Sequence, residues 1–280
     1  MHDRFWRSRM DSRAIIGSLF GAPRALIGVI HLDALPGTPR SRRDVRDIVE
    51  LAVAEAGLYA RAGFHGLMIE NTHDRPYLKG TAGPEISVTM GVIGSEIRRA
   101  VSLPLGIQVL AAANRSSIAV AHACGASFVR VEGFVFSHVA DEGFMESDAG
   151  DLLRYRRAIG ADAVRVFADV KKKHSAHAIT ADVGIAETAK AAEFFLADGI
   201  IVTGISTGTP AAPEDVREVS ASVGLPTIVG SGITPENISR YEAADAFIVG
   251  SSVKTDGVWS SPLDQERARA VVRAFQNLSH

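Results

Sequence analysis

Ile228-Val229-Gly230-Ser231-Gly232 and Phe247-Ile248-Val249-Gly250-Ser251 are the stretches that decide the fold of this chain. Each is a short apolar run that ends in Gly-Ser. Both runs are too short for a helix and apolar throughout, which is typical of strands buried on both faces of a parallel sheet. Thr234, Pro235 and Glu236 follow the first run and suit an N-cap, a first helical position and an acidic first turn. We therefore expect a short helix directly after the first Gly-Ser-Gly.

The paired Gly-Ser turns also predict an anion-binding site. Glycine allows backbone N–H groups to approach a ligand closely, and a helix N-terminus adds partial positive charge. One such turn alone would indicate no more than a tight connection between a strand and a helix. Two in succession are the arrangement with which the last two strands of a (β/α)₈ barrel bind phosphate. The expected phosphate-binding residues are Gly204, Gly230, Ser231, Gly232, Gly250 and Ser251.

Six further apolar runs precede these two, and most of them end in polar residues. The expected strands cover residues 25–30, 66–71, 104–110, 128–134, 164–171 and 199–204. Helical patterns lie between them, and a last helix is expected over 263–278. This alternation suits either a closed barrel or a doubly wound open sheet. The first strand is not followed by Gly-x-Gly-x-x-Gly, and polar residues end nearly all eight strands, so the closed barrel is favoured.

The sequence thus predicts an α/β protein with a single (β/α)₈ TIM barrel over residues 23–280. Residues 1–22 form an N-terminal helical extension, with a basic, aromatic tail over 1–10 and a short helix over 13–20 that closes the bottom of the barrel. A long loop is expected over 136–147. A chain of 280 residues suits one such barrel.

Composition limits the classes of function. The formal net charge of −2 gives no general attraction to nucleic acid or to anionic membranes. Cys124 is the single cysteine, which excludes an intrachain disulfide and suits a reducing compartment. No apolar run is long enough to span a membrane. We expect a cytoplasmic protein and a homo-oligomer.

Polar residues at the strand ends should converge on one barrel mouth. So many charged groups in a small space must pair, bind a ligand or change their pKa values. Because side chains alternate along a strand, we expect Asp169 and Lys171 to point the same way, as should Arg130 and Glu132. The expected substrate-binding residues are Asp33, Asn71, Gln108, Arg130, Glu132, Lys173, His174 and Thr203.

Asp169, Lys171, Glu70 and His31 are the candidate catalytic residues. Asp169 would orient the Lys171 ammonium, which could protonate an enolate or carbanion. A desolvated lysine among residues 171–173 could instead form a Schiff base. The alternative is that these lysines form a solvated basic turn without a chemical role.

A divalent metal is the one cofactor that the sequence suggests. His31, Asp33 and Glu70, together with Asp169, offer the nitrogen and oxygen ligands that such an ion prefers. No His-x-His or His-Glu-x-x-His spacing supports the site, and a hydrogen-bonded rim is the alternative.

Several motifs together resemble the BtpA family over roughly residues 24–275. They include His31-Leu32 with Ala34-Leu35-Pro36-Gly37, Gly66-Leu67-Met68-Ile69-Glu70-Asn71, and Phe167-Ala168-Asp169-Val170. The resemblance implies a (β/α)₈ barrel related to phosphate-binding barrels. Cyanobacterial members are associated with photosystem I biogenesis at the thylakoid membrane, and SgcQ-like members lie near sugar-utilisation genes. Ala111-Ala112-Ala113-Asn114, Glu132 and Lys171 depart from the family pattern and imply altered selectivity.

Two classes of function therefore stay open. The first is an enzyme that acts on a small phosphorylated, sugar-like compound as an isomerase, an epimerase or an aldolase-type lyase. The second is a non-catalytic assembly factor of the photosystem I biogenesis type, peripheral to a membrane. The density of ionisable groups at the mouth favours the enzyme, whereas the basic, aromatic N-terminus favours the assembly factor.

Overall fold

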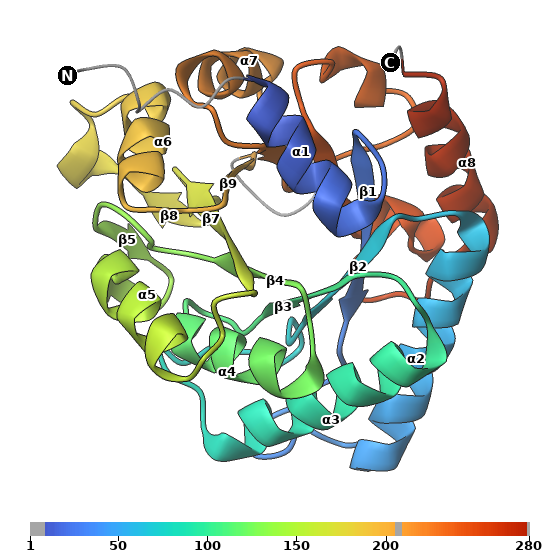
Figure 1. Ribbon diagram of the computed structural model, residues 1–280. Coiled ribbons are helices and arrows are strands. Elements are labelled where there is room, and N and C mark those ends of the chain that lie inside the picture. Colours follow the sequence, from blue (N-terminus) through green and yellow to red (C-terminus); the bar gives the residue numbers. More distant parts are fainter. Residues whose placement is uncertain (1–8, 205–208, 279–280) are drawn as a thin grey trace.

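Eight parallel strands close into a barrel in the computed structural model, which describes residues 9–204 and 209–278 (Figure 1). Around the barrel the strand order is β1-β11-β10-β9-β7-β4-β3-β2. The prediction of a closed barrel rather than an open sheet is confirmed. The strands are β1 (Ala25–His31), β2 (Gly66–Glu70), β3 (Leu105–Gln108), β4 (Phe128–Val131), β7 (Arg165–Val170), β9 (Gly199–Val202), β10 (Thr227–Val229) and β11 (Ala246–Val249).

Helices surround the barrel and return the chain from the end of one strand to the start of the next (Figure 1). Local sequence explains their limits. The Asp44 side chain accepts a hydrogen bond from the Arg46 N–H at the start of α2, and Gly63 ends that helix with a φ of 97°. The helices are α2 (Val45–Ala62), α3 (Pro84–Ala100), α4 (Asn114–Cys124), α5 (Ala149–Ala158), α6 (Ile185–Phe194), α7 (Pro213–Ser222) and α8 (Gln265–Gln276).

The prediction of a helix directly after Gly232 is wrong. The chain forms turns there and then a single 3₁₀ turn, η2 (Ile238–Arg240). Asn237 Oδ1 accepts a hydrogen bond from the Thr234 N–H at 2.8 Å, and Asn237 Nδ2 donates one to the Gly232 carbonyl at 2.8 Å. These bonds close a compact turn in place of a first helical turn. The other 3₁₀ turns are η1 (Ala178–Thr180), η3 (Ser251–Val253) and η4 (Thr255–Gly257).

Apolar side chains fill the barrel interior, and α1 (Arg9–Phe20) covers its N-terminal end (Figure 1). Ile16 and Phe20 pack into this core, where the Phe20 and Phe128 ring centroids lie 5.7 Å apart. A Cβ on Gly66 would lie 2.6 Å from the Phe20 ring, so the strand needs glycine at that contact. The predicted closing helix is confirmed, although it begins at Arg9 rather than Arg13. Residues 1–8 of the predicted tail lie outside the described residues.

A second, smaller sheet lies where a long loop was expected over 136–147. It contains β5 (His138–Ala140), β6 (Gly143–Met145) and β8 (Ser175–Ala176), all antiparallel. Because β8 belongs to the connection after β7, this sheet joins two loops of the barrel. The expected loop is therefore partly a hairpin.

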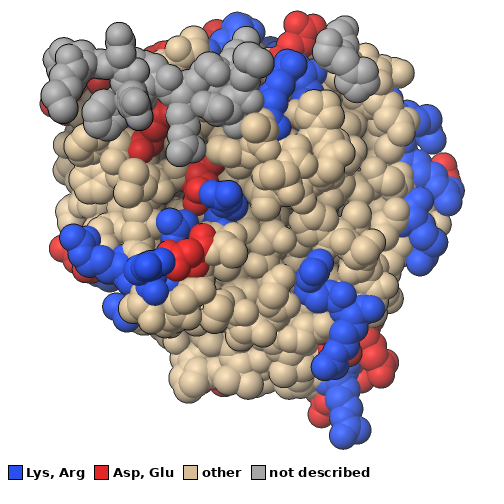
Figure 2. Space-filling view, in the orientation of Figure 1, with Lys and Arg blue, Asp and Glu red and all other residues tan. Residues whose placement is uncertain are grey.

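The surface carries mixed charge on the face drawn in Figure 2, where Lys and Arg form separate groups with Asp and Glu among them. In the part of the chain that the structure describes, no helix has both the length and the apolar character needed to cross a membrane.

Candidate active site at the barrel mouth

The inward-facing side chains change from apolar to polar at the C-terminal end of the barrel. His31 follows Val29 two positions along β1, just as Glu70 follows Met68 on β2. His31 pairs in register with Glu70, and Glu70 pairs with Gln108. The same alternation places Arg130 after Phe128 and Asp169 after Phe167. The predicted convergence is thus observed for five residues, namely His31, Glu70, Gln108, Arg130 and Asp169.

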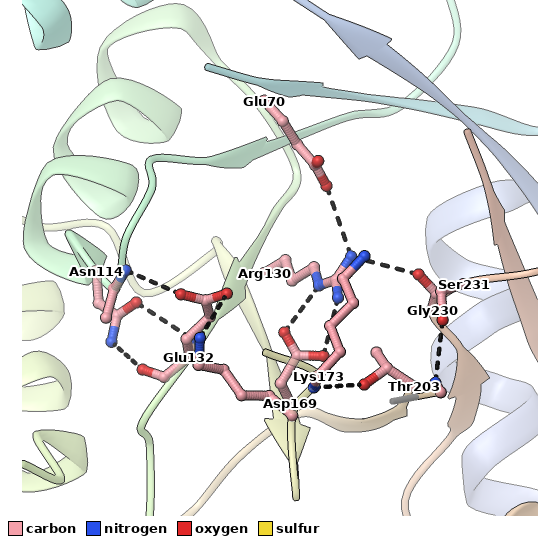
Figure 3. A network of polar contacts seen from close by, with 12 residues as sticks. Glu70, Asn114, Arg130, Glu132, Asp169, Lys173, Thr203, Gly230 and Ser231 are labelled. Carbon is pink, nitrogen blue, oxygen red and sulfur yellow. Dashed lines mark hydrogen bonds and ion pairs between the residues drawn. The ribbon is translucent and has the colours of Figure 1, made fainter. Parts of the chain in front are cut away.

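Arg130 is the central cation of the mouth and is only 5% exposed (Figure 3). Its Nε and Nη2 donate to the two carboxylate oxygens of Asp169 at 2.8 and 3.0 Å. Its Nη1 lies 3.5 Å from Glu70 Oε1 and donates to the Gly230 carbonyl at 3.5 Å. Burial disfavours the charged guanidinium, but the charges of Asp169 and Glu70 outweigh burial and raise the pKa of Arg130. Asp169 therefore holds this cation in place through a two-pronged ion pair.

Glu70 is buried and incompletely paired. Its Oε1 receives no hydrogen bond from any described residue. Burial raises the pKa of Glu70, although the charges of Arg130 and Lys173 oppose that effect. A buried acceptor without a donor is uncommon and calls for a functional explanation. Glu70 is thus suited to hold or to transfer a proton.

Lys171 does not point into the mouth, so the expectation that it shares the orientation of Asp169 is wrong. Strand β7 ends at Val170, and Lys171 adopts a φ of 45°. Alternation holds only while the backbone stays extended, and this left-handed residue turns the side chain away. The Lys171 ammonium donates to the Thr180 carbonyl and hydroxyl at 2.8 and 3.0 Å.

Lys173 occupies the mouth instead. Its backbone N–H donates to Thr203 Oγ1 at 3.1 Å, and its side chain runs toward the Arg130 guanidinium (Figure 3). Burial and the charge of Arg130 lower the pKa of Lys173, against the opposing effect of Glu70. The sequence placed Lys173 and Thr203 among the substrate-binding residues, and the structure places both beside the charged cluster.

Glu132 extends the charged cluster beyond the end of β4. Its Oε1 lies 3.6 Å from Lys172 Nζ, and its Oε2 accepts from the Ala112 N–H at 3.1 Å. Asn114 Nδ2 donates to the Glu132 carbonyl at 2.8 Å and so fixes the backbone of this residue (Figure 3). Lys172, which is 8% exposed, was not singled out from the sequence.

His31 is held as a neutral imidazole. Burial and the charge of Lys254 lower the pKa of His31 to about 3. Its Nδ1 lies 2.8 Å from the Trp259 carbonyl oxygen. Because that oxygen can only accept, Nδ1 carries the proton and Nε2 keeps a free lone pair. A Cβ on Gly250 would lie 3.2 Å from Nε2, so this lone pair is close to the β11 turn and can accept a hydrogen bond from a ligand there.

Three predicted binding residues lie outside this cluster. Asp33 is half-buried and forms an ion pair with Arg43 at 2.6 Å. Asn71 Oδ1 accepts from the Leu110 N–H at 2.7 Å, while its Nδ2 donates to Asp74 at 2.9 Å, so its hydrogen bonds stabilise neighbouring loops. His174 lies in the loop after β7 with a φ of 54°.

The structure does not assemble the predicted metal ligands. Asp33 forms an ion pair with Arg43, and Glu70 lies 3.5 Å from Arg130. Over residues 9–204 and 209–278, no three His, Cys, Asp or Glu side chains gather closely enough to hold an ion. In the part of the chain that the structure describes, His31, Asp33 and Glu70 therefore do not form the predicted ligand set.

The predicted phosphate-binding turns divide into two groups. Ser231 Oγ accepts from the Gly204 N–H at 3.1 Å and donates to the Thr209 carbonyl at 3.2 Å. A Cβ on Gly204 would lie 2.2 Å from Thr209 O, and one on Gly230 would lie 2.5 Å from the Ile201 side chain. Gly204, Gly230 and Ser231 thus allow loops and strands to pack closely, rather than exposing backbone to a ligand.

The remaining turn residues line a hollow of about 530 Å³ between the β10 and β11 connections. Gly232, Gly250 and Ser251 contribute backbone to its wall, and the Arg267 side chain from α8 adds a cation. Glu236 lines the same hollow and is the one acid among its described lining residues. Arg267 was not predicted, because it lies 15 residues beyond the turn, in a separate helix.

Comparison with known proteins places the chain in a family. Residues 22–277 match the BtpA family, and the protein belongs to it. It is 43% identical to a mitochondrial protein of Caenorhabditis elegans, over 96% of this chain and 99% of that protein. It is 35% identical to the photosystem I biogenesis protein BtpA of Synechocystis, over 91% of this chain and 89% of that protein.

Solved structures show the same fold at low sequence identity. Geranylgeranylglyceryl phosphate synthase from Thermoplasma acidophilum, in complex with sn-glycerol-1-phosphate, has a TM-score of 0.60 and 16% identity, and the match covers 95% of this chain and 98% of that one. Phosphoribosyl anthranilate isomerase from Thermus thermophilus has a TM-score of 0.54 and 14% identity, over 91% and 100% of the two chains. These likenesses establish the barrel fold.

Proposed function

We propose that this protein is an enzyme that acts on a small phosphorylated, sugar-like compound at the barrel mouth. The reaction is an isomerisation, an epimerisation or an aldolase-type cleavage. Each of these requires a proton to leave or join a carbon or oxygen next to a carbonyl group. Glu70 would move such a proton, the neutral His31 would accept a hydrogen bond from the substrate, and Arg130 and Lys173 would stabilise the negative charge that develops on oxygen.

The observation that carries this proposal is the incomplete pairing of buried Glu70. Its Oε1 has no hydrogen-bond donor among the described residues, although Arg130 lies 3.5 Å away. A purely structural cluster would gain stability by satisfying this oxygen or by replacing it with an apolar group. A substrate hydroxyl or C–H group at the mouth would provide the missing partner.

The phosphate group would bind in the hollow beside the mouth. Gly232, Gly250 and Ser251 contribute backbone there, and Arg267 contributes a cation. Fold neighbours give independent support, since several are named for phosphate compounds and one was solved with sn-glycerol-1-phosphate. Because a Cβ on Gly250 would lie 3.2 Å from His31 Nε2, a bound phosphate would place the rest of a small molecule next to His31.

Calorimetric titration with inorganic phosphate tests the binding half of the proposal. Arg267→Gln should weaken binding by about tenfold, the effect of losing one charge-assisted hydrogen bond. Arg269→Gln is the matched control, because Arg267 and Arg269 share α8 and have side chains 45% and 49% exposed. Equal affinity in the two variants would rule out this hollow as the phosphate site.

Solvent exchange tests the catalytic half. A panel of phosphorylated aldoses and ketoses in heavy water should show deuterium incorporation next to the carbonyl group, detected by NMR. Glu70→Gln should lower the exchange rate by about two to four orders of magnitude. If no compound of the panel exchanges with the parent protein, the proposal of proton abstraction from such compounds is rejected.

A non-catalytic assembly role is the second candidate, and exposed apolar residues favour it. Phe194, Phe195 and Leu196 follow one another at the end of α6 and are 74%, 47% and 68% exposed. Consecutive exposed residues of this kind are typical of contact surfaces. Replacing Phe194 and Leu196 by Ser should then abolish partner binding and leave phosphate binding intact. Because one relative is named for photosystem I biogenesis, the partner to look for is a component of a protein assembly.

A further inference from the structure

Lys173 differs from its two lysine neighbours in having no partner for its ammonium group. Lys171 donates to Thr180, and Lys172 lies 3.6 Å from Glu132. For Lys173, the backbone N–H donates to Thr203 Oγ1 at 3.1 Å and the carbonyl accepts from Ser175 Oγ at 3.3 Å, but no described residue forms an ion pair or hydrogen bond with its Nζ. The backbone is thus fixed while the side-chain nitrogen stays available.

The surroundings of Lys173 disfavour a second positive charge. Figure 3 shows its side chain directed at the guanidinium of Arg130, which is buried and permanently charged. Asp169 neutralises Arg130 through two short hydrogen bonds, and Glu70 has a raised pKa that reduces its negative charge. Burial and Arg130 accordingly lower the pKa of Lys173, so more of its amine is neutral than for an exposed lysine.

The mouth also contains the groups that imine formation requires. His31 stays neutral, and its Nε2 has a free lone pair that can accept a hydrogen bond from water or from a substrate hydroxyl group. Glu70 is buried, incompletely paired and raised in pKa, so it can donate a proton to a carbonyl oxygen. A lysine amine next to a fixed cation, in the same mouth as a buried acid, is the arrangement of a nucleophilic lysine.

We propose that Lys173 forms a covalent imine with a carbonyl carbon of the phosphorylated substrate. The inference rests on the proposed function and restricts the substrate class to phosphorylated aldehydes and ketones. The neutral Nζ forms a bond to the carbonyl carbon, and the oxygen takes a proton to give a carbinolamine. The nitrogen then loses a proton, the hydroxyl group is protonated and leaves as water, and a C=N bond remains. Addition of water reverses these steps, and the cycle needs neither oxidant nor reductant.

Borohydride trapping tests this step directly. The full-length protein is incubated with dihydroxyacetone phosphate or glyceraldehyde 3-phosphate, treated with sodium borohydride and analysed by intact mass and peptide mapping. Hydride reduces the imine to a stable secondary amine. We expect one adduct per chain, located at Lys173, and lowered at least about tenfold by excess inorganic phosphate.

Two variants make the result specific. Lys173→Met should abolish the adduct, and Lys171→Met should leave it unchanged because Lys171 lies two residues away but outside the mouth. Melting curves establish that both variants are folded. An adduct spread equally over surface lysines, or no adduct with either probe, overturns the proposal.

Competitive acetylation against pH provides a test that needs no substrate. Lys173 should be half-labelled at a lower pH than Lys171, and Arg130→Met should raise that pH if the fixed cation is responsible. Failure of this inference is distinguishable from failure of the proposed function. If phosphate binds in an Arg267-dependent manner but Lys173 is not trapped, only the imine is rejected; if phosphate does not bind, the proposed function itself fails.

Discussion

The two ends of the barrel are built from the same eight strands, yet their inward side chains behave in opposite ways. At the N-terminal end, Ile16 and Phe20 of α1 complete an apolar cluster that includes Phe128. At the C-terminal end, Arg130 and Glu70 are just as buried, but the cluster contains a carboxylate oxygen without a donor. Only two positions along β4 separate Phe128 from Arg130.

This difference shows how one scaffold can separate stability from chemistry. The apolar cluster at the N-terminal end gains free energy from each buried side chain. The charged end contains groups that a stability-optimised barrel would replace, as is common at functional sites. Substitutions at the two ends should therefore change the free energy of unfolding by different amounts and in different directions.

The largest loss of stability should come from a substitution at the N-terminal end of the barrel, which α1 covers. Phe20→Ala removes a ring that is 7% exposed and leaves a cavity beneath α1. We expect the free energy of unfolding to fall by about 3–5 kcal/mol. Urea denaturation measures this free energy. The control is Phe194→Ala, at a position 74% exposed, which should change the free energy of unfolding by less than about 0.5 kcal/mol. Similar small losses in both variants would mean that α1 adds little to the core.

The next largest effect should come from the ion pair of the mouth. Asp169→Asn leaves the buried Arg130 without its carboxylate and should cost about 3 kcal/mol. The double variant Arg130→Met/Asp169→Leu removes both charges and should cost less than that single change. Asp162→Asn breaks the exposed pair with Arg157, whose side chain is 78% exposed, and should cost less than about 1 kcal/mol. A double variant that is much less stable than Asp169→Asn would show that the pair itself stabilises the fold.

Glu70→Gln should change stability in the opposite direction. Because the pKa of Glu70 is raised above 4.5, the folded protein binds its proton more tightly than the unfolded chain does. The contribution of this group to stability is therefore greatest at low pH and falls as pH rises above 4.5. At pH 7 the variant should be as stable as the parent or more stable, by up to about 1 kcal/mol, while deuterium exchange is lost. Denaturation curves of both proteins from pH 4 to 8 give the difference between their free energies of unfolding at each pH. A variant that is less stable than the parent at every pH contradicts the prediction.

The smallest effect is expected for Lys171→Met. Its ammonium contacts only Thr180 among the described residues and lies outside the mouth. Stability should change by less than about 0.5 kcal/mol and the exchange rate should be unaltered. A large loss of deuterium exchange in this variant would show that Lys171 is catalytic although it lies outside the mouth.

The sequence predicted the barrel because its strands are buried on both faces and therefore appear as uninterrupted apolar runs. It also identified the mouth residues that lie within or at the end of a strand, such as Glu70 and Arg130, because alternation applies to them. Asn71 was expected to bind substrate, but it directly follows Glu70 and its side chain bonds Leu110 and Asp74 instead.

Residues beyond the strand ends were not predictable in the same way. The left-handed conformation of Lys171 decides which of three consecutive lysines enters the mouth, and lysine has no special preference for that conformation. Asp33 is turned outward by Arg43, a contact that the local sequence does not reveal. Arg267 and Trp259 reach the site from the last helix and the loop before it, where no strand pattern points to them.

The pairing of β5 with β8 has a consequence for how this barrel can be altered. The connections after β4 and β7 share a sheet through Val139 and Ala176, so neither loop is an independent module. Barrels of this type usually acquire new specificity by exchange of single loops. Here a graft of one loop would leave an unpaired strand edge in the other, which is a site for aggregation. New specificities should therefore be engineered, and should have evolved, by changing the two loops as a pair.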